Sequence, residues 1–449
     1  MLSLSEAQDR TEALVRQARK AGADTADAIY VCNASTGVTV RLGEMEDVEQ
    51  SEGEEIGLRV FVGQRSATVS ASDLERSSLS QLVDRCVAMA REAPEDPYAT
   101  LAPEGLLMRG RAPGLDLLDD ESRCEPADLK ARALEAEDSA RSVPGVTNSE
   151  GGGASMGWAQ VALATSTGFV GGYAGSSHGT WASVLAGEGA GMQRDHASHS
   201  SRHLEDLEEA EEIGRRAGHR AVARLGATKI KGGPMPVIFD PRVGGSLIGH
   251  LIGAIAGPAI TRRSSFLLDD LGATLFDSGV TIIDDPLRRR GLRSRPFDGE
   301  GLPTHKTALI DKGVLTGWLL DSASARQLGK RPSGHASRGT SGAPGVSATN
   351  VYMQPGRASP GELMQGIARG IYVTELIGMG VNPVTGDYSR GATGFLIENG
   401  GVSHAVTEIT IAGTLKEMFA ALTPANDLEF RYAINVPTLR IDGMTVAGG

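Results

Sequence analysis

Alternation between apolar and polar residues sets the expected order of elements in the first half of the chain. In residues 4–21, Leu4, Leu14 and Val15 recur at helical spacing, which predicts an amphipathic helix. Short β-branched segments separated by Gly, Ser or Asn follow, and they predict an antiparallel meander that ends in a second helix. We place the strands at residues 26–32, 36–42, 55–62 and 66–70 and the helix at residues 72–92.

The same layout returns after residues 93–125, a segment rich in Pro and Gly that is typical of a domain linker. A helix is expected over residues 126–142, and a strongly charged helix over residues 203–225 closes this unit. Short strands are expected between the two helices, at residues 145–153, 156–165, 168–176 and 179–186. The two units share a layout, although no sequence identity between them is evident.

From Pro236 onward the pattern predicts a strand, a helix at about residues 244–256 and then mainly strands, with a hairpin turn at residues 397–402. These strands are expected at residues 279–284, 307–311, 314–321, 351–354, 371–379, 391–399, 401–406 and 439–445. The fold class is therefore α+β, with N-terminal layers of helix and antiparallel sheet followed by a β-rich part that contains one central glycine-faced helix. The expected domains are residues 1–92, 126–230 and 231–449, with the linker at 93–125.

Composition narrows the class of protein. A length of 449 residues suggests two or three domains, and 40% hydrophobic with 22% charged residues is typical of a soluble globular protein. The 59 glycines and 4% aromatic residues indicate many tight turns and cores of small aliphatic side chains. A net charge of -12 argues against a general nucleic-acid binder, because phosphate neutralisation needs a basic surface.

The cysteines and the start of the chain indicate a compartment. Cys32, Cys86 and Cys124 are odd in number and lack metal-type spacing, and the first 20 residues contain no apolar signal core. We therefore expect a reducing cytoplasm. No run approaches the roughly 18 apolar residues that span a bilayer, so membrane insertion is not expected.

The helix at 244–256 has the position that a zinc metallopeptidase would use for two histidines and a glutamate. Beyond Ser246 its only polar residue is His250, which aliphatic neighbours flank, so we expect a hydrogen-bonded buried histidine rather than a metal ligand. Glycines at 249, 253 and 257 recur every four residues, and we expect them to allow close approach of a strand or another chain.

Other polar groups have a functional and a structural interpretation. His196, His199 and His203 would share one face if a helix began early enough, which could bind a metal, but a polar loop entering a helix is the favoured interpretation. The arginine loop, residues 286–303, could grip a peptide carboxylate, a partner chain or a nucleic-acid backbone, or could only offset an acidic surface. Candidate cleft or partner contacts are Arg263, Ser264, Ser265, Asp298, Glu300, Thr349, Asn350 and His250.

Several segments together resemble the TldD/PmbA family over nearly the full length of the chain. They are residues 46–63, 264–272, 295–301, 395–400 and 437–443. In that family the TldD type is a zinc metallopeptidase whose helix carries HExxxH and whose C-terminal region adds a cysteine ligand. On this helix the motif falls at Ile248, Gly249 and Gly253, so no ligand is retained, and residues 426–436 contain no cysteine. The resemblance is thus to the PmbA (TldE) type of subunit.

The resemblance implies a cytoplasmic heteromeric peptidase in which a TldD-like partner holds the zinc. This chain would then have no metal, no cofactor and no catalytic residue of its own. The complex would act on short unfolded or modified peptides, such as bacteriocin precursors and antitoxins. The family's older label, modulator of DNA gyrase, does not require DNA binding. The glycine-faced helix and the arginine loop are the expected surfaces for the partner. The alternative is a stand-alone peptide-binding or scaffolding homodimer.

Overall fold

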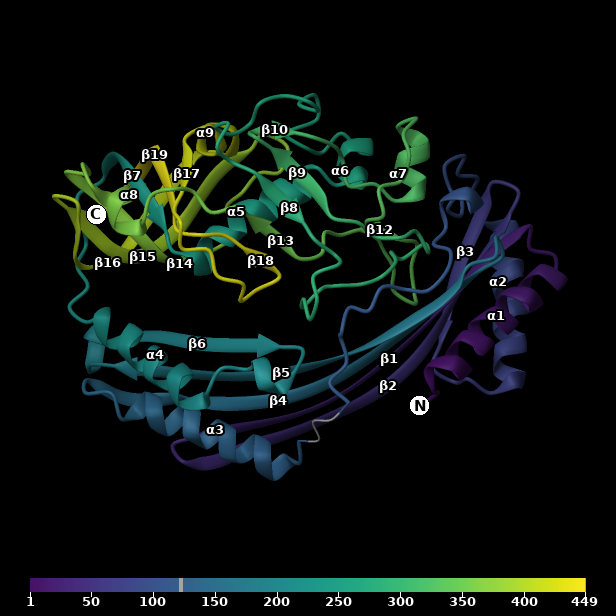
Figure 1. The fold of residues 1–449 in the computed structure, drawn as a ribbon, viewed down its shortest axis with the longest axis horizontal. Coiled ribbons are helices and arrows are strands. Elements are labelled where there is room, and N and C mark those ends of the chain that lie inside the picture. Colours follow the sequence, from purple (N-terminus) through teal and green to yellow (C-terminus); the bar gives the residue numbers. More distant parts are fainter. Residues whose placement is uncertain (121–123, 449) are drawn as a thin grey trace.

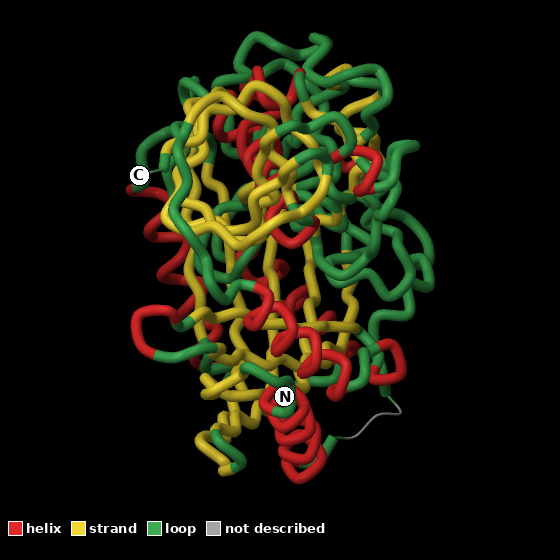
Figure 2. Tube along the Cα trace, turned by 90° about the vertical axis from the view of Figure 1, so that its left-hand side faces the viewer, coloured by secondary structure: helices red, strands yellow, loops and turns green. Residues whose placement is uncertain are grey.

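The computed structural model describes residues 1–120 and 124–448. A long curved antiparallel sheet lies against the β-rich C-terminal part, and the two termini lie on opposite sides of the molecule (Figures 1 and 2). The predicted α+β class, with helices and antiparallel sheet followed by a β-rich region, is confirmed. The linker predicted at 93–125 includes residues 121–123, and the C-terminal domain predicted at 231–449 includes residue 449, both outside the described residues.

The N-terminal sheet has the strand order β3-β2-β1-β4-β5-β6. Its strands are β1 (Thr25–Arg41), β2 (Glu44–Val62), β3 (Arg65–Ala71), β4 (Val146–Thr165), β5 (Val170–Ala186) and β6 (Gln193–Ser201). Helices α1 (Leu4–Lys20) and α2 (Arg76–Glu92) lie at one end of the sheet, and α3 (Pro126–Arg141) and α4 (Ala210–Ala223) lie at the other (Figure 1). Short 3₁₀ turns are η1 (Glu104–Leu106), η2 (Gly189–Gly191) and η3 (Leu204–Asp206).

The prediction of many short strands in this half is wrong. The segments predicted at 26–32 and 36–42 form one strand, β1, which pairs with β2 on one side and with β4 on the other. Asn33 and Ser35, which lie between the two predicted strands, stay extended because neighbours on both sides complete their hydrogen bonds. The predicted central unit therefore shares one sheet with the predicted N-terminal unit.

Each face of this sheet packs against a different part of the chain. On β1, Ala28 and Tyr30 join the cluster formed with α1 and α2, whereas Ile29 between them joins Phe297 and Leu302 of the C-terminal part. Successive side chains of a strand point to opposite faces, so one strand contacts both layers. The C-terminal part thus lies on the sheet face that the helices leave free.

Two larger sheets, one two-stranded sheet and several short helices build the C-terminal part. One sheet has the order β16-β15-β14-β7-β19-β17, and an additional pairing of β16 with β19 closes it into a ring; the other has the order β10-β9-β8-β13-β18. The strands are β7 (Gly233–Phe239), β8 (Ile282–Asp284), β9 (Thr307–Asp311), β10 (Val314–Leu315), β11 (Ala336–Ser337), β12 (Gly345–Val346), β13 (Val351–Met353), β14 (Arg369–Ile377), β15 (Asp387–Glu398), β16 (Gly401–Thr414), β17 (Leu422–Pro424), β18 (Ile434–Asn435) and β19 (Leu439–Ala447). The helices are α5 (Pro241–Ala254), α6 (Gly257–Thr261), α7 (Ser322–Gln327), α8 (Pro360–Met364) and α9 (Leu415–Ala420).

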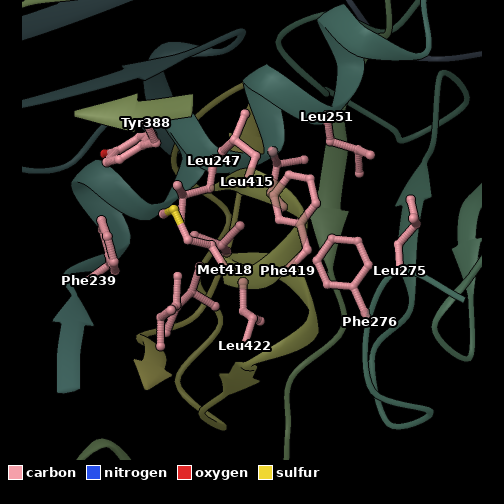
Figure 3. Close-up of a cluster of buried hydrophobic side chains, with 14 of the residues drawn as sticks. Phe239, Leu247, Leu251, Leu275, Phe276, Tyr388, Leu415, Met418, Phe419 and Leu422 are labelled. Carbon is pink, nitrogen blue, oxygen red and sulfur yellow. The ribbon is translucent and has the colours of Figure 1, made fainter. Parts of the chain in front are cut away.

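The predicted helix and hairpin of this part are confirmed. Helix α5 begins at the cap residue Asp240 and packs Leu247 and Leu251 into the core beside Phe276 and Phe419 (Figure 3). The hairpin joins β15 to β16, and Asn399 and Gly400 both have positive φ at its turn. None of the helices among residues 1–120 and 124–448 is both long and apolar enough to cross a membrane.

A buried arginine joins the C-terminal part to the N-terminal sheet. The side chain of Arg338 is buried and forms an ion pair with Asp27 of β1, which also binds Arg59 of β2 at 2.6 Å. Next to this pair, Gly57 of β2 faces the backbone of Thr340 so closely that an added Cβ would lie 2.1 Å from its carbonyl oxygen. The loop of residues 338–340 is therefore fixed on the sheet.

Candidate functional site

A polar cleft runs between the central unit, at β6 and α4, and the C-terminal part, at the start of α5 and the loop of residues 427–436. It consists of three adjoining hollows of about 520, 490 and 410 Å³. Tyr432, which is 40% exposed, lines all three, and Arg242 lines the two that meet at α5. These shared residues place the three hollows next to one another along the cleft.

Buried ion pairs hold the two walls together near the middle of the cleft. Asp195 of β6 accepts a hydrogen bond from Arg242 Nη1 at 2.9 Å and lies 3.5 Å from Arg224 Nη1. Arg224 also donates to Glu375 of β14 at 2.7 Å. Burial opposes the charge of Arg242, but the carboxylates of Asp240 and Asp195 raise its pKa above the usual range. The ion pairs therefore join strand β6 to helix α5.

Helix α5 presents one side to this cleft and the opposite side to the core. Arg242 and Ser246 line the hollow, whereas the side chain of Ile248 is fully buried in the core. A Cβ added at Gly249 or Gly253 would meet nothing within 4 Å, so no other part of the described chain approaches these two glycines. Gly249 and Gly253 follow Arg242 and Ser246 along the same side of the helix, beyond the residues that line the hollow, whereas Ile248 lies on the core side.

The third glycine of the series does allow a close approach. A Cβ at Gly257 would lie 2.3 Å from Ser324 Oγ of α7. The predicted packing role therefore holds at Gly257, and at Gly249 and Gly253 the helix surface is open. This open surface has room for another chain, as the sequence analysis expected for these glycines.

His250 lies on α5 against the ring of Tyr388, with ring centroids 6.2 Å apart at 79°. The expected hydrogen bond is absent at one ring nitrogen, because Nε2 is buried and has no partner among the residues the structure describes. Burial and the nearby charge of Arg390 lower the pKa of His250. Burial likewise raises the pKa of Tyr388 to about 12, against the opposing effect of Arg390.

The donors around α5 are few. Helix α5 carries a single imidazole, His250, and it lies outside the motif positions Ile248, Gly249 and Gly253. The loop that carries Phe430, Arg431, Tyr432 and Asn435 completes this wall without a thiol. Across residues 1–120 and 124–448, no group of three or more His, Cys, Asp or Glu side chains is placed to hold a metal ion.

For His196, His199 and His203 the sequence favours a polar loop entering a helix over a metal-binding helical face, and the structure has a strand at the first two. His196 and His199 belong to strand β6, so the helical spacing is wrong, and a separation of three residues on a strand directs them to opposite faces. Nδ1 of His199 accepts a hydrogen bond from the backbone N–H of Glu208, and His203 Nε2 lies 3.1 Å from the carbonyl oxygen of Asp116. The rings of His199 and His203 therefore have separate partners.

The largest hollow is strongly basic. Its walls contain Arg202, Arg288, Arg289, Arg290 and Arg431, together with a single acid, Asp206. Part of the arginine loop predicted from the sequence lies here, and Asn350 fixes it by accepting a hydrogen bond from the N–H of Arg293 at 2.9 Å and donating to Ser294 Oγ at 2.8 Å. Of the predicted cleft or partner contacts, Asn350 lines this hollow.

The other predicted contacts lie outside the three hollows. Ser265 is buried and donates to the carbonyl oxygen of Ala254, so it closes the end of α5, and Ser264 bonds Ala259 in the same turn. Arg263 is exposed with positive φ. Thr349 donates to the buried carboxylate of Asp284.

Asp298 and Glu300, predicted as cleft or partner contacts, are both buried and do not border the cleft. Asp298 is 1% exposed and accepts the backbone N–H groups of Glu300, Leu302 and Ala336. Glu300 is 3% exposed and accepts two hydrogen bonds from Ser322. Burial raises the pKa of Asp298 and raises that of Glu300 to about 7, against the lowering effect of Arg59 on Glu300. Asp298 and Glu300 therefore hold the segments around Ala336 and Ser322 in place near Arg338.

Sequence patterns missed most of the cleft. Asp195 and Arg242 are 47 positions apart, and neither belongs to a motif. Phe430 and Tyr432 are among the few exposed aromatic side chains. Two aromatic residues in the segment 426–436 were the sequence feature that could have indicated a binding surface there.

Comparison with known proteins gives a consistent result along the chain. Models of the PmbA/TldA metallopeptidase family match it three times: domain 1 at residues 26–90, the central domain at 119–225 and the C-terminal domain at 232–448. Metalloprotease PmbA of Escherichia coli O157:H7 is 37% identical over 92% of this chain and 90% of that protein. The Metalloprotease PmbA homolog of Haemophilus influenzae is 32% identical over 97% and 94%.

Solved structures share the fold. A crystal structure from Bacteroides thetaiotaomicron, described as a candidate modulator of DNA gyrase, has a TM-score of 0.91 at 25% identity and covers 100% of both chains. The crystal structure of TldE from Thermococcus kodakarensis has a TM-score of 0.87 at 22% identity, with 98% of this chain and 100% of that chain covered.

Proposed function

Because this chain belongs to the PmbA/TldA metallopeptidase family, we propose that it is a zinc-free subunit of a cytoplasmic peptidase complex. A zinc-binding relative of the TldD type would supply the metal and the hydrolytic step. This chain would help to hold the substrate, a short unfolded or modified peptide.

The wall of the cleft at α5 carries this proposal. A catalytic zinc needs three protein ligands and an open position, whereas α5 carries a single imidazole, His250, which lies outside the three hollows. Arg220, Arg242 and Arg390 line the adjoining hollow and place positive charge where a cation would sit. The residues present do not fit a zinc ion, so no step of the chemistry runs through a metal on this chain.

Metal content and partner dependence test the proposal. The purified chain should contain no stoichiometric zinc and should cleave a pool of unstructured peptides only after a TldD-like chain is added. Replacing the glutamate of the partner's HExxxH motif should abolish that cleavage, while His250→Ala in this chain should leave the zinc content of the complex unchanged. Tight zinc together with peptidase activity in the isolated chain would contradict the proposal.

A stand-alone peptide-binding homodimer is the second candidate. One observation favours it: the surface of α5 at Gly249 and Gly253, where an added Cβ would meet nothing within 4 Å, has room for a second copy of the chain. Affinity purification from the native cell separates the two candidates, because recovery of a zinc-bearing relative supports the first and self-association alone supports the second.

A further inference from the structure

Two arginines of the basic hollow have no carboxylate partner among the described residues. Asp116 binds Arg289 and Arg290, and Glu208 binds Arg431. Burial opposes the charge of Glu208, but hydrogen bonds from Arg431 and Arg216 lower its pKa to about 2, so it stays ionised. These arginines are thus largely neutralised. Arg202 and Arg288 keep an uncompensated positive charge.

Arg202 is held in place by backbone oxygens alone. Its Nη1 donates to the carbonyl oxygen of Ser176 at 3.0 Å, its Nε to that of Gly291 at 3.4 Å, and its Nη2 to that of Leu292. These bonds use three of the five N–H groups of a guanidinium, which leaves donors for a ligand. A carbonyl oxygen orients the group without cancelling its charge.

Arg288 is held by an aromatic ring. Its guanidinium carbon lies 3.6 Å from the ring centroid of Phe430, and Phe430 packs edge-to-face on Tyr352 at 5.2 Å. Stacking fixes the plane of the guanidinium and leaves its edge free to donate two parallel hydrogen bonds. A preorganised group loses less conformational freedom when a ligand binds.

We propose that this hollow binds the carboxylate of a peptide through Arg288 and Arg202. The inference rests on the proposed function and specifies its substrate: a short peptide with a free C-terminal carboxylate or an acidic side chain. A hollow of about 520 Å³ accommodates a few residues, and Phe430 and Tyr432, each 40% exposed, provide apolar contact beside the charges. A nucleic acid fits less well, because the chain carries a net charge of -12 and the flanking arginines are already paired with acids.

Binding of designed peptides to the full-length isolated chain tests the inference. The probes are a fluorescein-labelled, unstructured hexapeptide of Gly, Ser, Ala and Leu with a free C-terminus, its C-amidated form, and the amidated form with one Glu. By fluorescence anisotropy the free acid should bind at least about tenfold more tightly than the amide, as two charge-assisted hydrogen bonds require. If the Glu peptide recovers this affinity, a side-chain carboxylate also serves; if it does not, the site recognises the C-terminus.

Substitutions locate the effect. Arg288→Gln should abolish the difference between acid and amide, Arg288→Lys should retain part of it, and Phe430→Leu should reduce it because the guanidinium loses its support. The control Arg85→Gln, on the exposed side of α2, should change nothing. Unchanged melting temperatures would show that each variant folds.

Several outcomes would overturn the inference: equal affinity for acid and amide, no binding of any probe, an unaffected Arg288→Gln variant, or tighter binding of a single-stranded oligonucleotide than of the peptides. Loss of carboxylate preference with intact partner-dependent cleavage would overturn this inference alone. Failure of cleavage with an intact preference would overturn the proposed function instead.

Discussion

Arg242 at the start of α5 donates a hydrogen bond to Asp195 of β6 across 2.9 Å, although 47 positions separate the two residues. The pair joins the strand that ends the N-terminal sheet to the first helix of the C-terminal part. It also lies in the wall of the cleft, so the same contact fixes the position of α5 and the shape of the candidate site. Stability and function are therefore coupled at this point.

Asp195→Asn should destabilise the protein strongly. The change leaves Arg242 and Arg224 buried without this carboxylate, and breaking a buried pair by removal of one partner typically costs about 3–5 kcal/mol. Calorimetry should show a clearly lower melting temperature. As a control, Glu12→Gln breaks an exposed pair with Arg16 and should cost less than about 1 kcal/mol. Similar losses in both variants would contradict the role assigned to Asp195.

Gly57→Ala should loosen the loop that fixes the C-terminal part on the sheet. The new Cβ would lie 2.1 Å from the carbonyl oxygen of Thr340, so the loop must move, at a cost of about 1–3 kcal/mol. Limited trypsin digestion should then cut after Arg338, whose side chain is buried in the native protein. Gly37→Ala on neighbouring β1, where nothing lies within 4 Å, should leave the digestion pattern unchanged.

Gly253→Ala should stabilise the isolated chain by about 0.5–1 kcal/mol, because Gly253 is an exposed helical residue with open space around it. Gly257→Ala should do the opposite, since its Cβ would lie 2.3 Å from Ser324 Oγ. The melting temperature should rise for Gly253→Ala and fall for Gly257→Ala. A stabilised Gly253→Ala variant that fails to associate with a partner chain would place the interface on this face.

Glu300→Gln should change the pH dependence of stability. The folded state raises the pKa of Glu300 from 4.5 to about 7, so it binds the proton more tightly than the unfolded chain does. The stability from this group is fully present below about pH 4.5 and is lost as the pH rises through about 7, by up to about 3 kcal/mol. Glutamine stays neutral and its side-chain oxygen can still accept the bonds from Ser322, so the variant should be more stable than the wild type at pH 8 and similar at pH 4.5.

The measurement is the difference in melting temperature between variant and wild type at the two pH values. Glu135→Gln, an exposed position on α3, serves as the control and should give no pH-dependent difference. A wild type that is as stable as Glu300→Gln at pH 8 would show that Glu300 ionises without cost in the folded protein.

Local patterns predicted the C-terminal elements better than the N-terminal strands. Strand β9 lies where the apolar pattern placed it, and the hairpin of β15 and β16 turns at Asn399 and Gly400, because turn chemistry is a property of a few adjacent residues. In β1, Asn33 and Ser35 have turn-type side chains, yet pairing with β2 and β4 keeps them extended. Hydrogen bonds to two neighbouring strands outweigh local preference there.

The sequence alone determined the α+β class, the position of helix α5 and the family resemblance. It also showed that α5 has no HExxxH motif and that residues 426–436 contain no cysteine. Each of these depends on local pattern or on residue identity. Tertiary structure alone decided which polar groups meet. It separated His196, His199 and His203, buried Asp298 and Glu300, and brought Asp195 to Arg242 and Arg288 to Phe430. Contacts between distant segments depend on how layers pack against one another, and no short window of sequence contains that information.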